Sequence, residues 1–223
     1  AYRILPKSLL KIPKFGSINI HSSLLPKYRG AAPIQHALLN QEKFTGISTF
    51  LIEPKVDTGK IIDQFKVEIS PEDNYGSLSK KLSQAGAELI ESSVTKCYTN
   101  SADLIKQNDS EATLAPKILK DDLKINWNQD SKVILAMIKA FSPTPGAFTT
   151  INSKRLKIFK AEVIDCNSNN DVGVIYNVSK NYFDVQCKHN SLRIHRTQLE
   201  GKKVMDSKDF ILGYQNLDSS SLL

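Results

Sequence analysis

An amide and an imidazole lie close together in the stretch "SINIHSSLLPKYRG", residues 17–30. Apolar and polar residues alternate over residues 17–21, which predicts a short strand with Asn19 and His21 on one face. Two residues of strand separate these side chains by about 6–7 Å. An amide donor beside an imidazole suits an oxygen that becomes negative during acyl transfer. The stretch therefore predicts a reaction centre, although a strand histidine is more often a structural residue.

The turn "PKVDTGK", residues 54–60, offers the best carboxylate for this pair. Asp57 precedes Thr58 and Gly59 between two predicted strands, where a carboxylate can be held rigidly and can order a water for proton transfer. An aspartate before Thr-Gly is usually a turn residue, so the hypothesis depends on the three residues together. The sequence contains no G-x-S-x-G motif, and the nucleophile is therefore expected to belong to the substrate.

Periodicity predicts the elements that must position these residues. Strands are expected at 17–21, 46–53 and 61–69, and helices at 33–41, from about 73 to 97 after a start signal at Ser70 and Asp73, and at 131–141. The polar stretch 99–122 reads as a linker or wrapping segment. The runs that follow are short and alternating, which is typical of a small barrel or sandwich; they cover residues 148–151, 155–164, 173–178, 182–187 and 191–200.

Composition describes an ordinary globular chain. It has 223 residues, 24% charged and 40% hydrophobic, and no run near the roughly 18 apolar residues of a membrane span. Its three isolated cysteines predict reduced thiols in a cytosol-like compartment and argue against a zinc site, so no metal is expected. The net charge is +7, and residues 151–203 hold ten Lys and Arg against five Asp and Glu. That excess suits a polyanion such as nucleic acid, or a solvated strand surface.

Longer motifs resemble a known enzyme family. "NIHSSLLPKYRGAAPIQHAL" followed by "VDTGKII" resembles the formyltransferase superfamily, and "RGAAPIQ", "FSPTPGAF" and "TQLEGKKVM" narrow the resemblance to methionyl-tRNA formyltransferases. The resemblance runs along essentially the whole chain. It implies an α/β fold in which the C-terminal half of a doubly wound (Rossmann-like) domain is followed by a small OB-like β-barrel domain. The implied domains are 1–101 (catalytic, first half missing), 102–122 (linker) and 123–223 (tRNA-binding).

The resemblance also implies roles for individual residues. The family's catalytic trio falls on Asn19, His21 and Asp57. Asn19 and protonated His21 would stabilise the oxyanion, and Asp57 would support the imidazolium and relay protons. The implied formyl donor is 10-formyltetrahydrofolate, bound along Ser23, Leu24, Leu25 and Pro26. The implied acceptor is initiator methionyl-tRNA, with phosphate contacts expected from basic residues: Arg29, Lys154, Arg155, Arg193, Arg196, Lys202 and Lys203.

Departures from the family pattern keep alternatives open. The chain begins at "AYRILP", in the middle of the family's first domain, so an N-terminally truncated fragment with impaired activity is expected. Arg3 stands where the family usually has Gly, and Thr144 replaces a common Trp. One alternative is a formyltransferase acting on an amino sugar nucleotide; glycinamide ribonucleotide is disfavoured because its enzyme lacks the β-rich tail. Another is a non-catalytic tRNA-binding remnant. A monomer without membrane attachment, in a bacterial cytoplasm or an organelle matrix, is expected.

Overall fold

The computed structural model describes residues 5–166, 170–214, 217–218 and 220–223. Arg3 lies outside the described residues. The chain divides into two compact units. The first comprises residues 1–73 and 77–118, and the second comprises residues 74–76 and 119–223.

The first unit is built on a three-stranded sheet. Strands β1 (Ile18–His21), β3 (Phe44–Leu51) and β4 (Ile61–Glu68) form it in the order β1-β3-β4. These confirm the predicted strands to within a few residues. Both pairings are antiparallel, with His21 opposite Ser48 and Ile47 opposite Phe65. The described part of the sheet therefore does not display the parallel pairing expected of a doubly wound domain.

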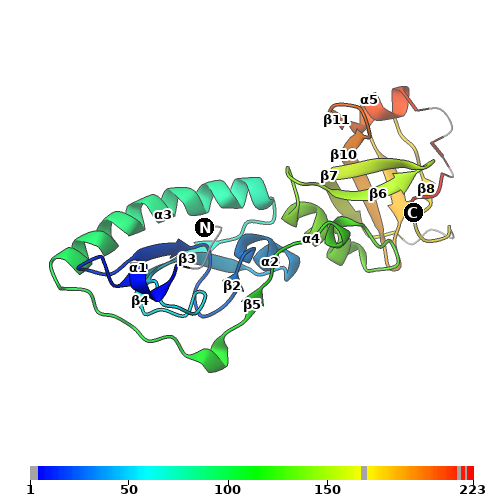
Figure 1. The fold of residues 1–223 in the computed structure, drawn as a ribbon. Helices are drawn as coiled ribbons and strands as arrows, with labels where there is room; N and C mark the ends of the chain where they lie inside the picture. The colour runs from blue at the N-terminus through cyan, green and yellow to red at the C-terminus, as the bar shows by residue number, and fades with distance from the viewer. Residues whose placement is uncertain (1–4, 167–169, 215–216, 219) are drawn as a thin grey trace. The chain divides into compact units, whose positions relative to one another are not determined.

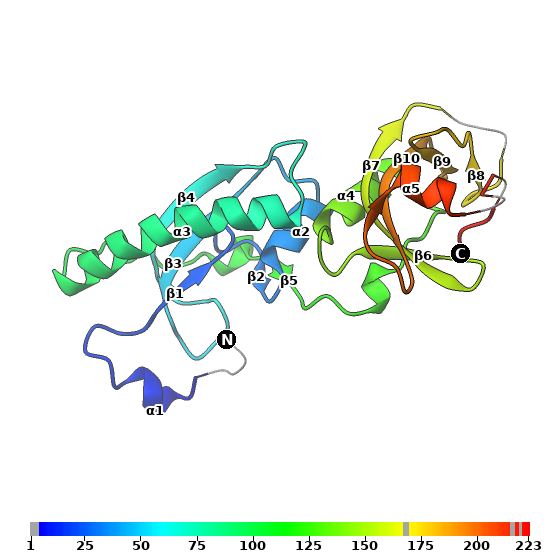
Figure 2. The ribbon, with the colours of Figure 1, turned by 90° about the horizontal axis from the view of Figure 1, so that it is seen from above.

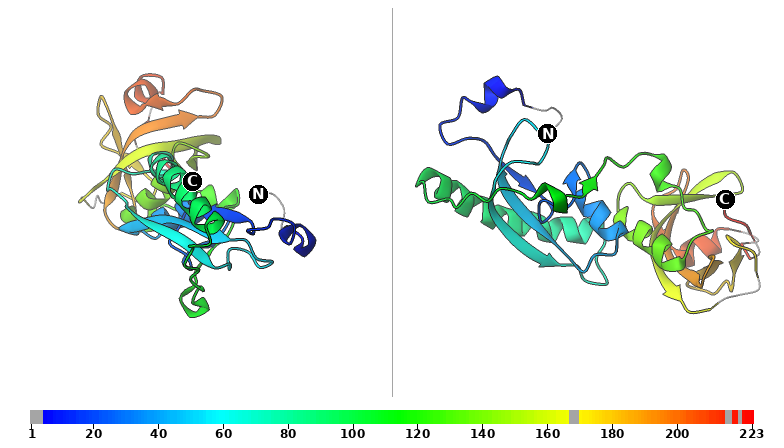
Figure 3. Two further views of the ribbon diagram at one scale, coloured as in Figure 1. Left: turned by 90° about the vertical axis from the view of Figure 1, so that its left-hand side faces the viewer. Right: turned by 90° about the horizontal axis from the view of Figure 1, so that it is seen from below.

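A long helix covers one face of this sheet. Helix α3 (Tyr75–Tyr98) lies over β3 in Figures 1 and 2, and Figure 3 shows the ribbon from two further sides. A Cβ built on Gly86 of α3 would lie 3.6 Å from Ile20 and 3.9 Å from Ile47, and the Thr49 and Ser93 hydroxyls are 2.6 Å apart. Ile20, Ile47 and Thr49 thus face the helix, which leaves Asn19, His21 and Ser48 on the opposite face.

That opposite face carries short elements and loops. Helix α2 (Pro33–Leu39) begins at a proline, as predicted, and strand β2 (Arg29–Gly30) pairs in parallel with β5 (Leu114–Ala115). Helix α1 (Lys7–Leu10) and the 3₁₀ turns η1 (Asp109–Glu111) and η2 (Asp121–Leu123) were not predicted. The stretch expected to be a linker is grouped with the first unit as far as Ile118. It is therefore part of the fold around β2.

The second unit is a curled antiparallel sheet of six strands (Figure 1). The order is β6-β7-β10-β9-β8, and β11 pairs with β10. The strands are β6 (Ala147–Ile151), β7 (Lys154–Ile164), β8 (Ile175–Tyr176), β9 (Phe183–Gln186), β10 (Ser191–Leu199) and β11 (Met205–Asp206). Helices α4 (Ser131–Ala140) and α5 (Ser207–Leu212) pack against it. The predicted run of alternating strands is confirmed, whereas α5 was missed.

Local chemistry explains the hairpins and core of the second unit. Asn152 and Ser153 both have positive φ, 45° and 63°, as a two-residue hairpin between twisted strands requires. A register shift after Ile194 marks a bulge in β10, and bulges increase strand bending. Buried Trp127 donates its indole N–H to Thr149 Oγ1 at 3.1 Å. Burial raises the pKa of the Cys187 thiol to about 12, so this cysteine is a packed thiol rather than a reactive one.

Asp73 fixes the entry to α3. Its buried carboxylate accepts hydrogen bonds from the Ser70 backbone N–H (2.8 Å), the Ser77 hydroxyl (2.7 Å) and the Lys81 ammonium (2.6 Å). Burial alone would raise the pKa of this carboxyl, but the three donors outweigh burial and lower it. The predicted start signal at Ser70 and Asp73 is thereby confirmed, although the helix itself begins at Tyr75.

We expect Asp73→Asn to lower the free energy of unfolding by about 1–2 kcal/mol, because charged hydrogen bonds are lost from a buried site. The folded-state pKa is depressed, so the contribution is present above the unfolded pKa of about 3.9 and is lost as pH falls through the folded value. Urea unfolding at pH 7 and pH 3 checks this, with exposed Glu72→Gln as control. Equal losses at both pH values would contradict the assigned charge effect.

Candidate functional site

Strand β1 presents Asn19 and His21 on the sheet face away from α3. His21 is 6% exposed, whereas Asn19, the residue opposite Phe50, is exposed. The His21 Nε2 atom lies 2.7 Å from the Tyr28 carbonyl oxygen, which can only accept, so Nε2 carries a proton and donates. With Nε2 engaged, Nδ1 is the nitrogen left to face a substrate or a bridging water.

Asp57 lies next to that nitrogen. Its Oδ2 atom is 3.7 Å from His21 Nδ1, which is beyond a direct hydrogen bond but within reach of a water bridge or a shared substrate atom. The side chain of Asp57 is 12% exposed, so the pair sits in a largely enclosed place. The structure thus brings together the imidazole and the carboxylate that the sequence predicted.

The Asp57 turn has an unusual backbone. Asp57 has φ +53°, in the left-handed region that aspartate tolerates better than most residues. Nearby Gly59 approaches the chain so closely that an added Cβ would lie 1.6 Å from the Leu51 carbonyl oxygen. The "DTG" order therefore meets a steric need of this turn as well as supplying a carboxylate.

Two residues from distant segments hold the turn. The Gly30 backbone N–H donates to Asp57 Oδ2 at 2.9 Å, and Gly30 itself (φ +128°) cannot carry a side chain because a Cβ would lie 2.4 Å from the Ala115 oxygen. The Gln107 amide nitrogen donates to the carbonyl oxygens of Asp57 (2.9 Å) and Gly59 (2.7 Å). Gln107 is 6% exposed. It was not predicted, because a glutamine in a polar, aperiodic stretch gives no signal of such a contact.

Arg29 completes this framework from inside the protein. Its guanidinium donates to Gln107 Oε1 through Nε (3.0 Å) and Nη2 (2.7 Å), and Nη2 also lies 2.8 Å from Asp109. Hydrogen bonding and charge from Arg29 lower the pKa of the Asp109 carboxyl. The sequence placed Arg29 among phosphate contacts, but the residue is 9% exposed and its donors serve the Gln107 side chain. We therefore correct that assignment: Arg29 is a support for the Asp57 turn.

The loop proposed to bind the folate, residues 23–26, is hydrogen-bonded to Ser48 of β3. Ser48 Oγ donates to the Ser23 carbonyl oxygen (2.7 Å) and accepts from the Leu25 N–H (3.0 Å). Ser23 is fully buried, and the Leu25 side chain packs with Phe50 and Ile61 in a core cluster. Neither side chain is available to a ligand, so their role is to shape the loop. Leu24 and Pro26 are partly exposed and remain proposed contacts.

The basic residues of the second unit divide into two groups. Lys154, Arg155, Lys202 and Lys203 are exposed, and Glu200 N–H donates to the Arg155 oxygen (2.8 Å), which joins the start of β7 to the turn after β10. We call these four residues the turn cluster. Arg193 instead pairs with buried Asp184 (2.9 Å) and lies over the Tyr182 ring, and Arg196 is 4.0 Å from Asp206. Arg193 and Arg196 lie within β10, before the turn that carries Lys202 and Lys203.

Within the described ranges, no group of three His, Cys, Asp or Glu side chains could hold a metal ion. No helix in that same part of the chain is long and apolar enough to cross a membrane.

We expect Gln107→Met to lower the free energy of unfolding of the first unit by about 2–3 kcal/mol, because two buried carbonyls and Arg29 lose their partner. Hydrogen exchange of the amides in residues 55–60 should accelerate. Chemical denaturation and exchange mass spectrometry measure both, with exposed Gln84→Met on α3 as the matched control. Exchange rates equal to wild type would show that something else holds the Asp57 turn.

Comparison with known proteins places this geometry in a family. The family described as "Formyl transferase" matches residues 1–94, and "Formyl transferase, C-terminal domain" matches residues 117–215. A methionyl-tRNA formyltransferase of Thermodesulfovibrio yellowstonii is 46% identical over 211 residues, which cover 95% of this chain and 67% of that protein. One of Staphylococcus aureus is 39% identical, covering 96% and 69%.

Solved structures share the fold. A methionyl-tRNA formyltransferase from Clostridium thermocellum has a TM-score of 0.57 at 22% identity, covering 76% of this chain and 72% of that one. The sugar 3N-formyl transferase WlaRD, with dTDP and 5-N-formyl-THF, has a TM-score of 0.64 at 26% identity, covering 83% and 66%. HypX from Aquifex aeolicus, in complex with tetrahydrofolic acid, has a TM-score of 0.68 at 16% identity, covering 88% and 34%.

The matches extend over both units, and the chain spans about two thirds of the length of the sequence relatives. With identities of 39–46% over nearly all of its residues, the chain belongs to the methionyl-tRNA formyltransferase family.

Proposed function

We propose that the chain transfers a formyl group from 10-formyltetrahydrofolate to the amino group of methionyl-tRNA, the reaction that prepares initiator tRNA for translation. The observation that carries the proposal is the approach of Asp57 Oδ2 to His21 Nδ1, 3.7 Å, in a chain of this family. The reaction fits a site without its own nucleophile, because the amine of the acceptor supplies one. Because bacterial translation takes place in the cytoplasm, we propose that compartment for the chain. We also propose that it works as a monomer.

Each site residue has one task in this proposal. The acceptor amine attacks the formyl carbon, a carbon–nitrogen bond forms, and the formyl oxygen takes up charge. Exposed Asn19 and the Nδ1–H of doubly protonated His21 donate to that oxygen, while His21 Nε2 keeps its hydrogen bond to the Tyr28 carbonyl. The bond to the donor nitrogen then breaks as a proton passes from the amine to that nitrogen. Asp57 orders the water that carries the proton.

The residues present fit the folate donor in part. Leu24 and Pro26 give a small, partly exposed apolar surface one loop away from His21, which suits the aromatic portion of a folate. Ser23 and Leu25 do not fit as contacts because they are buried. We propose that Leu24 and Pro26 hold the donor, which supplies the activated formyl group when bound.

The finer fold assignment is also a proposal. We infer that the β1-β3-β4 sheet is one edge of a doubly wound domain and that the second unit is an OB-like barrel that contacts tRNA. The supporting observations are the fold likeness to the Clostridium thermocellum enzyme and the curled, bulged sheet of the second unit. The turn cluster is the part of that unit best suited to phosphates, since all four of its cations are exposed.

Substitution of the trio tests the reaction. We expect His21→Ala and Asp57→Asn to slow formyl transfer by about 10²–10⁴-fold, as loss of an oxyanion or acid–base group does. The measurement is the rate of formyl transfer from 10-formyltetrahydrofolate to methionyl-tRNA, with exposed His189→Ala as control. A near-normal rate for Asp57→Asn would remove the carboxylate from the mechanism.

The rates of the wild-type chain with different acceptors in the same assay decide between the alternative functions. Faster transfer to a dTDP-linked amino sugar than to methionyl-tRNA would favour the sugar-directed reaction of WlaRD-like enzymes. No transfer to either acceptor, with tRNA still bound, would make this chain a binding protein and would overturn the proposal.

Salt dependence tests the tRNA surface. Replacing Lys202 and Lys203 by Gln should reduce the slope of log affinity against log salt by about 1.4–1.8, because each phosphate contact contributes roughly 0.7–0.9. Filter binding of methionyl-tRNA between low and physiological salt measures the slope. Lys180→Gln with Lys188→Gln, two exposed lysines outside the turn cluster, is the control pair. Equal slopes for the two pairs would argue against phosphate contacts at the turn.

A further inference from the structure

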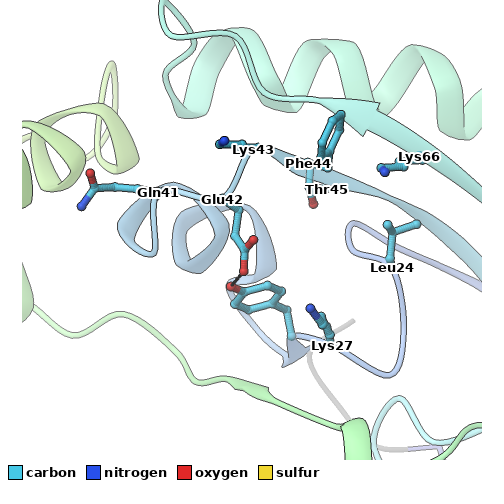
Figure 4. A pocket seen from close by; sticks show the side chains of 9 residues that line it. Leu24, Lys27, Gln41, Glu42, Lys43, Phe44, Thr45 and Lys66 are labelled. Carbon is cyan, nitrogen blue, oxygen red and sulfur yellow. Dashed lines mark hydrogen bonds between the residues drawn. The ribbon is translucent and has the colours of Figure 1, made fainter.

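We propose that a cavity beside the loop that carries Leu24 and Lys27 holds a backbone phosphate and its neighbouring base from the single-stranded 3′ end of the tRNA acceptor. This inference rests on the proposed function, since it assigns a further contact to the same substrate. The cavity has a volume of about 400 Å³ and opens between the loop, the start of β3 and the end of β4 (Figure 4). Pockets of this size hold small polar ligands.

Two ammonium groups give the cavity its charge. Figure 4 shows Lys27 and Lys66 directed into the gap from different segments, whereas Lys43 points away from it. None of the three is within ion-pair distance of a carboxylate among the described residues. Glu42 also lines the cavity, but its carboxylate accepts the Tyr28 hydroxyl proton at 2.7 Å. The free cations therefore outnumber the one engaged anion, which favours an anionic group such as phosphate.

An exposed aromatic ring lies next to these cations. Phe44, the first residue of β3, is 46% exposed, and Lys66 Nζ lies 3.9 Å from the centroid of its ring. An aromatic face next to cations is the combination with which proteins bind single-stranded nucleic acids, because the ring stacks on a base while the cations meet the backbone. Lys66 already meets the ring, and the surface of Phe44 that stays exposed offers a base a place to stack, which a simple inorganic anion would not use.

The cavity is close enough to His21 to hold a nucleotide near the tRNA 3′ end while the amino acid attached to that end reacts beside His21. Tyr28 links the two places, because its carbonyl oxygen accepts from His21 Nε2 while its side chain lines the cavity. Ser48 lies opposite His21 in the sheet, and cavity residue Thr45 is three residues away on the same strand, about 10 Å. A nucleotide in the cavity would therefore lie near the reacting group, beside Leu24, which lines the cavity and is also a proposed donor contact.

Binding of the full chain to an RNA minihelix with a single-stranded 3′ end tests the proposal. We expect Lys27→Gln/Lys66→Gln to weaken binding and to reduce the salt slope by roughly 0.7 per lost phosphate contact. Lys11→Gln/Lys80→Gln removes the same charge from exposed positions that do not line the cavity and serves as the control. Phe44→Leu should weaken binding by about fivefold or more while leaving the salt slope unchanged.

Two further arms identify the ligand. On a minihelix without its single-stranded 3′ nucleotides, the cavity variants should bind as the wild type does. Affinity for 10-formyltetrahydrofolate should be unchanged in all of them. The proposal is overturned if the Lys27/Lys66 pair matches the Lys11/Lys80 pair, if the deficit persists on the trimmed RNA, or if folate affinity falls instead. Failure of the wild type to bind the RNA would reject the proposed function too, whereas wild-type binding without these differences rejects the cavity alone.

Discussion

The Asp57 turn is the constraint on which the candidate site depends. Its left-handed residue, Asp57, places a carboxylate oxygen 3.7 Å from His21 Nδ1. Three hydrogen bonds from distant segments hold the turn: one from the Gly30 N–H to the carboxylate and two from the Gln107 amide to carbonyl oxygens. Because Gln107 is in turn fixed by Arg29, the segment after α3 is a structural part of the site. Pre-organised groups of this kind spare a reaction the cost of reorganisation.

Local signals explain which features could be predicted from the sequence. Alternation in residues 17–21 placed Asn19 and His21 on one face, and the turn chemistry of Asp57 marked the carboxylate, because both depend on neighbours in the chain. The described structure confirms the strands, the main helices and the approach of His21 to Asp57. Gln107, the β2–β5 pairing and the inward direction of Arg29 depend on contacts between residues 48–85 positions apart, and no periodicity encodes those.

The arginines illustrate why composition could not identify the surface that meets RNA. Arg29 and Arg193 were counted with the phosphate contacts, yet each donates to an internal partner, Gln107 and Asp184 respectively. The planar guanidinium favours such paired, partly buried geometry, whereas lysines keep their hydrated ammonium groups in solvent. The exposed cations of the two proposed RNA contacts are accordingly mostly lysines: Lys154, Lys202 and Lys203, beside Arg155, in the turn cluster, and Lys27 and Lys66 at the cavity.

The two ring nitrogens of His21 face different parts of the site. Since Nε2 donates to the Tyr28 carbonyl, the imidazole is anchored to the loop that begins at Ser23, and Nδ1 faces the Asp57 side. Tyr28 also meets Glu42 through its hydroxyl, and burial together with this hydrogen bond raises the pKa of the phenol, which keeps it a donor. One residue thus ties the reacting imidazole to the wall of the neighbouring cavity. Because Tyr28 contacts both places, we expect a ligand that displaces this wall to move the His21 imidazole as well.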